Sequence, residues 1–156
     1  MRIHLIAVGN RMPRWVQQGY ADYAARLPRE CILNLVEIPP GRRGKNADTA
    51  RILREEGGRI LQGIPGDCRV IALEVRGRAW STEELAGRLD GWLMSGRDLA
   101  LLVGGPEGLD DSARARADTL WSLSPLTLPH PLVRVIVAEQ LYRAWSILTN
   151  HPYHRA

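Results

Sequence analysis

The stretch "LLVGGPEGLDD" at residues 101–111 runs from an apolar segment into two glycines, a proline and an acidic turn. Its apolar part belongs to a run at 99–104, and similar runs rich in Ile, Val and Leu occupy residues 2–8, 32–38 and 69–75. Short apolar runs bounded by Gly or Pro are typical of strands buried on both faces. The four runs therefore predict the strands of one sheet.

Segments with helical spacing of apolar residues lie between these runs. The first, 16–27, is ended by Pro28, the second begins near Asp48, and the third opens with a capping box at 81–84 and closes at Gly96. Strands alternating with helices predict parallel strands and crossover helices, and so an α/β fold. Ligands of such folds bind beyond the carboxyl ends of the strands.

Length and composition place the chain in a broad class. The 156 residues predict a single domain over 1–156, and the net charge of +4 is compatible with a polyanionic partner. Among 21 basic residues Lys45 is the only lysine, which indicates either phosphate recognition by arginine or merely a GC-rich genome. Cys31 and Cys68 lack the spacing of a metal site, and the first apolar run is too short to cross a membrane. We expect a cytoplasmic protein without a metal.

The last third of the chain predicts one more strand and one long helix. Residues 120–128 alternate apolar side chains with Ser and Thr, like a short strand that unravels into a loop, and Pro129 and Pro131 stiffen its exit. A helix is predicted from about Leu132 to Asn150, because Pro152 prevents its continuation.

Basic residues at two predicted loops are candidate contacts to RNA. Arg42, Arg43 and Lys45 form a small cationic patch in a Gly-flanked loop at the carboxyl side of a strand, which suits a phosphodiester backbone. His130 and Arg134 lie at the entrance of the long helix, where the helix dipole favours an anion. Ordinary solvated surface residues remain an alternative for both groups.

The tail "NHPYHRA" at 150–156 contains more titratable, charged and aromatic side chains than a disordered terminus requires. Its histidines and Arg155 add positive or titratable groups, and Tyr153 can stack on a base as RNA-binding proteins do. A frayed terminus without function is the alternative.

The motifs together resemble one family. The segments "IHLIAVG", "RGKNAD", "LLVGGPEGL", "SLSPLTLPHPLVRVIVAEQLYRAWSI" and "NHPYHRA" are similar to the small bacterial SPOUT-class methyltransferases that modify a pseudouridine at N3 in 23S rRNA. The resemblance covers the whole chain. It implies an α/β sheet whose C-terminal part forms a deep trefoil knot, S-adenosylmethionine (SAM) bent within that knot, and a homodimer. It also implies helix 69 of 23S rRNA as the target, in the assembled 70S ribosome.

The resemblance also implies roles for individual residues. The cofactor-binding residues implied are Leu73, Gly104, Leu123, Ser124, Pro125, Leu126, Thr127 and Leu128. Pro125 departs from the family pattern, which has a small non-proline residue there, and its lack of an N–H excludes a hydrogen bond from that residue to adenine. In the tail, His154 is the candidate base, Arg155 the candidate holder of a phosphate or an oxyanion, and Tyr153 the residue that orients the target base.

Two other functions stay open at the level of sequence. A protein with this fold could bind ribosomal RNA without transferring a methyl group, or it could use SAM to methylate a small molecule. SAM binding and methyl transfer separate the first alternative from the enzyme. Salt-insensitive activity on free nucleosides would favour the second.

Overall fold

A five-stranded parallel sheet with the order β2-β1-β4-β3-β5 forms the centre of the protein. The structure, a computed structural model, describes residues 1–155; Ala156, the last residue of the tail motif, lies outside the described residues. The strands are β1 (Arg2–Val8), β2 (Ile32–Ile38), β3 (Arg69–Ala79), β4 (Leu99–Val103) and β5 (Thr119–Ser122). The predicted α/β class with a parallel sheet is confirmed.

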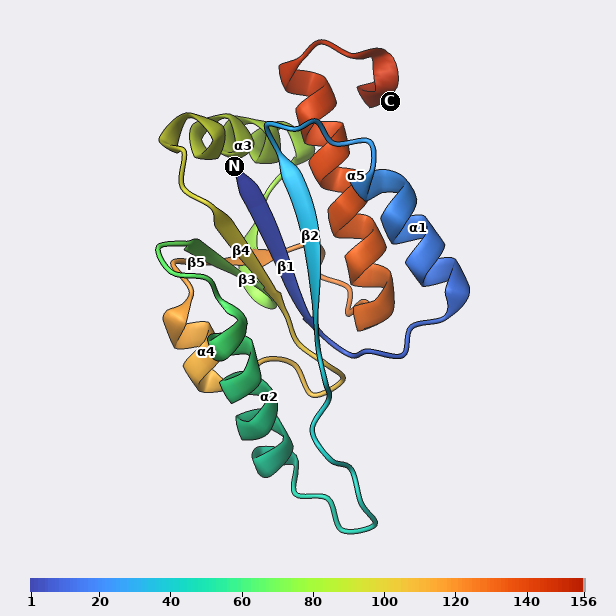
Figure 1. Ribbon diagram of the computed structural model, residues 1–156, viewed down its shortest axis with the longest axis vertical. Helices are drawn as coiled ribbons and strands as arrows, with labels where there is room; N and C mark the ends of the chain where they lie inside the picture. The colour runs from blue at the N-terminus through green and yellow to red at the C-terminus, as the bar shows by residue number, and fades with distance from the viewer. Residues whose placement is uncertain (156) are drawn as a thin grey trace.

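Helices cover both faces of the sheet (Figure 1). The helices are α1 (Arg14–Ala24), α2 (Thr49–Gly63), α3 (Thr82–Ser95), α4 (Asp111–Arg116) and α5 (His130–Leu148), followed by a 3₁₀ turn, η1 (Pro152–His154). Alternate residues of β1 point to opposite faces, as in any strand. Ile3 and Leu5 pack into the cluster under α1, α3 and α5, whereas Ile6 and Val8 pack into the cluster under α2 and α4.

The predicted helix boundaries have local causes in the structure. The side chain of Asp48 accepts a hydrogen bond of 3.0 Å from the Ala50 amide and so caps α2. Ser81 and Glu84 form the predicted capping box of α3, and Gly96 ends that helix in the left-handed conformation with φ of 72°. These caps confirm the predicted beginnings of α2 and α3.

Strand β3 is longer than the apolar run predicted. Beyond an irregularity between Leu73 and Arg78, it pairs with β5 again, with Arg78 opposite Trp121. A Cβ on Gly77 would lie 2.6 Å from the backbone of Leu120, so the close approach of the two strands requires a glycine there. The polar residues of this extension carry no apolar signal, which is why the prediction stopped at residue 75.

Two features of the second half were not predicted as they occur. Helix α4 has only six residues, too few for a periodic pattern to show. Helix α5 begins at His130, two residues before the predicted start, with Pro129 as its N-cap and Pro131 in its first turn, where the missing N–H of a proline costs nothing.

Candidate functional site

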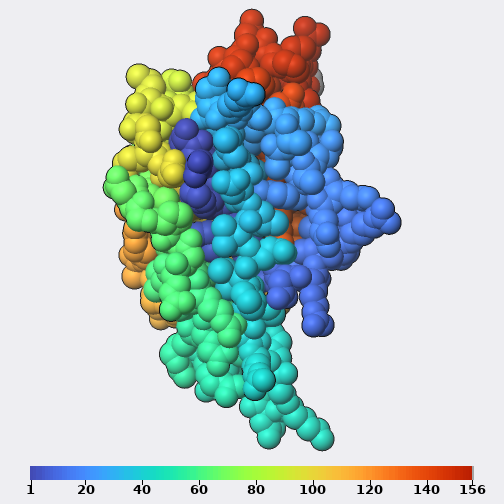
Figure 2. Space-filling view, in the orientation of Figure 1, coloured from blue at the N-terminus to red at the C-terminus, as the bar shows by residue number. Residues whose placement is uncertain are grey.

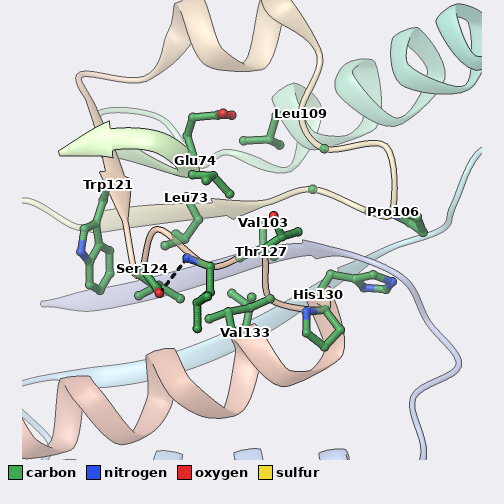
Figure 3. Close-up of a pocket in the computed structure, with 18 residues that line it drawn as sticks. Leu73, Glu74, Val103, Pro106, Leu109, Trp121, Ser124, Thr127, His130 and Val133 are labelled. Carbon is green, nitrogen blue, oxygen red and sulfur yellow. Dashed lines mark hydrogen bonds between the residues drawn. The ribbon is translucent and has the colours of Figure 1, made fainter. Parts of the chain in front are cut away.

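A pocket of about 420 Å³ opens at the end of β4, beside the irregularity that follows Leu73 in β3 (Figure 3). Its walls come from residues 73–75 in the middle of β3, the glycine turn after β4, and the loop that leads from β5 into α5. Its volume lies within the range of small-molecule sites. The apolar side chains of the wall include those of Leu73, Val103, Leu109, Trp121, Leu128 and Val133.

The three chain segments that the resemblance assigned to the cofactor meet at this pocket. The lining residues from that set are Leu73, Gly104, Leu123, Ser124, Leu126, Thr127 and Leu128. Pro125 is exposed and is not among the lining residues. The geometry therefore gathers the predicted cofactor residues at one site, with the exception of Pro125.

The glycine turn after β4 closes tightly on itself. The amide of Gly108 donates a hydrogen bond of 2.9 Å to the carbonyl oxygen of Gly105, and Gly108 has a φ of 81°. A Cβ on Gly104 would lie 2.4 Å from the carbonyl group of Gly108. Because Gly104, Gly105 and Gly108 all line the pocket, the turn presents backbone rather than side chains to a ligand.

The loop between β5 and α5 is held by Ser124. Its hydroxyl oxygen accepts a hydrogen bond of 3.0 Å from the Leu126 amide (Figure 3), and its carbonyl oxygen accepts one of 3.1 Å from the Ser122 hydroxyl. Within residues 1–155, the backbone amides of Thr127 and Leu128 have no hydrogen-bond partner. Two residues of this pocket wall thus have N–H groups without an internal partner.

Arg134 has a different environment from the one its sequence position predicts. The side chain is 1% exposed and donates hydrogen bonds of 2.8 Å to the carboxylate of Glu37 and 2.6 Å to the carbonyl oxygen of Gly9. A third bond, of 3.3 Å, reaches the carbonyl oxygen of Val8. A guanidinium buried and occupied in this way ties α5 to the ends of β1 and β2, which argues against the predicted RNA contact.

His130 lies at the pocket rather than on a free RNA-binding surface. It is half-buried, lines the pocket, and its Nδ1 atom is buried without a hydrogen-bond partner in the described part of the chain. Burial lowers the pKa of His130, and the charges of Arg134 and Arg43 lower it further. The imidazole is therefore uncharged at neutral pH. An uncharged imidazole suits a polar contact inside the pocket better than the predicted binding of a phosphate.

The predicted cationic loop is exposed and projects from one end of the molecule. Arg42, Arg43 and Lys45 are all exposed, and the chain between β2 and α2 forms the protrusion at the lower end of Figure 2. Arg43 forms an ion pair with Glu107 of the glycine turn. The loop therefore reaches the same edge of the sheet as the pocket.

The tail folds back onto α5 instead of fraying. The hydroxyl of Tyr153 donates a hydrogen bond of 3.0 Å to the carboxylate of Glu139, and its ring lies 4.5 Å from that of Tyr142. Burial, followed by the hydrogen bond to Glu139, raises the pKa of Tyr153, so its hydroxyl stays protonated. His154 is half-buried with an unpartnered Nδ1 within residues 1–155, and Arg155 is exposed.

The tail and the pocket lie at opposite ends of α5 (Figure 1). His130 at the first residue of the helix lines the pocket, whereas the tail follows its last residue, Leu148. A helix of 19 residues separates them by roughly 28 Å. A single copy of the chain therefore does not bring the predicted catalytic residues to the predicted cofactor residues.

Sequence reasoning missed one polar residue of the pocket. Glu74 is the only acidic side chain that lines it among residues 1–155, and its carboxylate lies 3.7 Å from the guanidinium of Arg114. Its place directly after Leu73 at the end of a strand was the available signal. In the described residues, no cluster of His, Cys, Asp and Glu side chains has a geometry that could hold a metal ion, and no helix is long and apolar enough to span a membrane.

Comparison with known proteins agrees with this architecture. A family model described as "Predicted SPOUT methyltransferase" matches residues 1–154. Among solved structures, a probable methylase family protein of Haemophilus influenzae superposes with a TM-score of 0.56 at 16% identity, covering 99% of this chain and 70% of the other. A probable methyltransferase of Bordetella pertussis gives 0.56 at 15% identity, covering 92% and 95%. These structures share the fold, and the family model over residues 1–154 places the chain in the SPOUT class of methyltransferases.

Curated relatives narrow the assignment. A protein of Thioalkalivibrio sulfidiphilus is 70% identical over 99% of both chains, and one of Alkalilimnicola ehrlichii is 64% identical over 100% of both. A third, of Methylococcus capsulatus, is 60% identical over 99% of this chain and 100% of its own. All three are named ribosomal RNA large subunit methyltransferase H. The chain belongs to this family of SPOUT methyltransferases.

Proposed function

We propose that this protein transfers a methyl group from SAM to N3 of a pseudouridine in helix 69 of 23S rRNA, on the assembled 70S ribosome. The observation that carries the proposal is the pocket, built from three separate chain segments in a chain 60% to 70% identical to ribosomal RNA large subunit methyltransferases H. The names of these relatives support ribosomal RNA as substrate, and the target atom and the ribosomal context follow from the family resemblance.

The pocket fits SAM in size and in chemistry. Apolar side chains such as Leu73 and Leu128 suit the faces of an adenine, and the free amides of Thr127 and Leu128 suit its edge. Bound there, SAM supplies the methyl group on a positively charged sulfonium. The backbone of the turn at Gly104 approaches a ligand where a side chain would exclude it.

The proposal includes the trefoil knot of the family. The loop after β5 contributes to the pocket beside both residues 73–75 of β3 and the turn after β4. The chain then continues into α5, which packs on the opposite face of the sheet from α4. Such a path between two earlier segments supports a threaded C-terminus.

The tail and the basic loop are assigned to the RNA. His154 accepts the N3 proton of the pseudouridine, Arg155 holds a phosphate or a carbonyl oxygen of the base, and Tyr153, fixed through Glu139, sets the position of the turn that carries both. Arg42, Arg43 and Lys45 contact the phosphate backbone of the rRNA. Positioning of the base against the methyl donor supplies most of the rate enhancement.

The proposal includes a homodimer, which the distance between tail and pocket supports. Since α5 separates the two within one copy, the tail of a second copy has to complete each pocket. We place the protein in the cytoplasm, where its ribosomal substrate occurs.

The decisive experiment is transfer of a labelled methyl group from SAM to 70S ribosomes from a strain lacking this enzyme. Label on N3 of one pseudouridine of helix 69, and none on ribosomes that already carry the modification, is the expected result. SAM binding without transfer to 70S ribosomes, 50S subunits or free 23S rRNA would leave a binding factor instead of an enzyme. Absence of SAM binding would refute the assignment of the pocket.

A further inference from the structure

The cationic loop and the glycine turn of the pocket are joined by one ion pair, between Arg43 and Glu107. Building on the proposed function, we propose that Glu107 is a positioning residue for rRNA: it holds the Arg43 guanidinium at the pocket rim, where the remaining N–H groups of that guanidinium bind an RNA phosphate. Glu107 thus acts through Arg43 and touches neither the cofactor nor the reacting base.

The beginning of the loop is fixed, which limits where Arg43 can go. The Gly41 amide donates a hydrogen bond of 2.9 Å to the carboxylate of Glu56, a side chain that is 2% exposed. Arg59 of α2 donates a hydrogen bond of 2.8 Å to the carbonyl oxygen of Pro39. Arg43 follows the anchored residue Gly41 by only two residues, which limits how far the backbone of Arg43 can move.

Glu107 is equally well placed from its own side. It sits inside the turn that the Gly108-to-Gly105 hydrogen bond closes, and only 22% of its side chain is exposed. Because the closed turn already fixes the backbone of Glu107, formation of the ion pair costs little additional conformational entropy at this residue. The pair therefore fixes Arg43 relative to the wall of the pocket.

Arg43 keeps donors for a second anion. A guanidinium carries five N–H groups, and in the described residues only the Nη1 atom of Arg43 makes a side-chain hydrogen bond. The side chain is 41% exposed, so the other donors can be reached from solvent. Arg42 and Lys45 form no ion pair within residues 1–155, which makes Arg43 the loop cation with a fixed direction.

The position of Arg43 relates the phosphate to the pocket. Its charge contributes to the lowered pKa of His130, a residue of the pocket wall, so the guanidinium lies within electrostatic reach of the pocket. A phosphate held by Arg43 would then flank the nucleotide whose base approaches the methyl donor. Phosphate contacts of this kind set register and orientation without reading sequence.

The substitution Glu107→Gln separates positioning from simple charge. Removal of an acid beside an RNA site should strengthen RNA binding by charge alone, whereas loss of the positioning contact should weaken it. We expect KM for ribosomes to rise about three- to tenfold with kcat and SAM affinity unchanged. Glu83→Gln removes the same charge from the exposed first turn of α3 and should leave KM unchanged.

A double-mutant cycle identifies the partner. The effect of Glu107→Gln should disappear in an Arg43→Gln background and persist in an Arg42→Gln background, since the guanidinium of Arg42 has no carboxylate partner in the described residues. An unchanged or lowered KM for Glu107→Gln, or an effect that survives Arg43→Gln, would overturn the proposal.

A direct binding measurement keeps this inference distinct from the proposed function. Filter binding of the same variants to 23S rRNA needs no methyl transfer. Weaker binding of Glu107→Gln that depends on Arg43, in a protein that transfers no methyl group, would refute the enzyme and retain the positioning role. If the wild type transfers methyl groups and all variants bind rRNA with equal affinity, the enzyme assignment stands and the positioning role of Glu107 is refuted.

Discussion

Gly104 has the least space for an added side chain among the glycines of the pocket. An added Cβ would lie 2.4 Å from the carbonyl group of Gly108, which is backbone and cannot rotate away. We expect Gly104→Ala to open the turn and to weaken SAM binding by at least about tenfold, measured by isothermal titration calorimetry.

Gly87→Ala is the matched control for this substitution. Gly87 lies in α3 with nothing within 4 Å of an added Cβ, and alanine favours a helix more than glycine does. The control protein should bind SAM like the wild type. Wild-type affinity of the Gly104→Ala protein would show that the ligand does not use this turn.

The buried environment of Arg134 indicates a role in stability instead of RNA binding. Replacement by Met keeps most of the buried volume but leaves the carbonyl oxygens of Val8 and Gly9 without their charged donor. We expect Arg134→Met to lower the free energy of unfolding by about 2–4 kcal/mol, measured by urea denaturation. A variant of unchanged stability with weaker rRNA binding would instead restore the role predicted from its sequence position.

The hydrogen bond that ties the tail to α5 can be tested by a single substitution. Tyr153→Phe removes the hydrogen bond to Glu139 while the ring can keep its contact with Tyr142. We expect a loss of about 1 kcal/mol in stability and a several-fold lower kcat with unchanged SAM affinity, because the turn that carries His154 is less well held. Wild-type kcat in single-turnover methyl transfer would mean that the position of the tail does not limit the reaction.

Elements with a strong apolar signal could be predicted from the sequence, and those without one could not. Strands β1 and β2 match their predicted runs because each is bounded by residues that end a strand. The extension of β3 depends on pairing with β5, which comes some 40 residues later in the chain and leaves no local pattern. Helix α4 and the turn η1 are too short for periodicity to reveal them.

The chain segments that form the site could be predicted, but the long-range contacts of its side chains could not. The rule that ligands bind at strand ends indicated the turn after β4, and the resemblance indicated Leu73 and the loop after β5; the structure brings these segments together. The roles of their residues in SAM binding stay predictions. The burial of Arg134 depends on Glu37 and on the end of β1, so no local pattern could reveal it.

At the scale of the whole molecule, the proposed dimer can be tested by mixing two inactive variants. His154→Ala damages the tail and leaves the pocket intact, whereas Gly104→Ala damages the pocket and leaves the tail intact. If each active site combines the pocket of one copy with the tail of the other, a mixed dimer has one intact site. Randomly exchanged subunits should then recover about one quarter of wild-type methyl transfer.

The same mixture has a clear negative outcome. Sites formed within one copy would each retain a single lesion, so mixing would restore nothing. Unmixed samples of each variant, taken through the same exchange procedure, give the background. Recovery well below one quarter, in samples where exchange of subunits is complete, would contradict a shared site.

The separation of pocket and tail along α5 has a consequence for enzyme abundance. If each pocket needs the tail of a second copy, as proposed, a chain that is alone is inactive, and activity follows the amount of paired chain instead of the total amount. Below the dissociation constant of the pair, halving the protein would cut the rate to about one quarter, because paired chains then scale with the square of concentration. A cell that dilutes this protein by growth would lose modification faster than it loses the polypeptide.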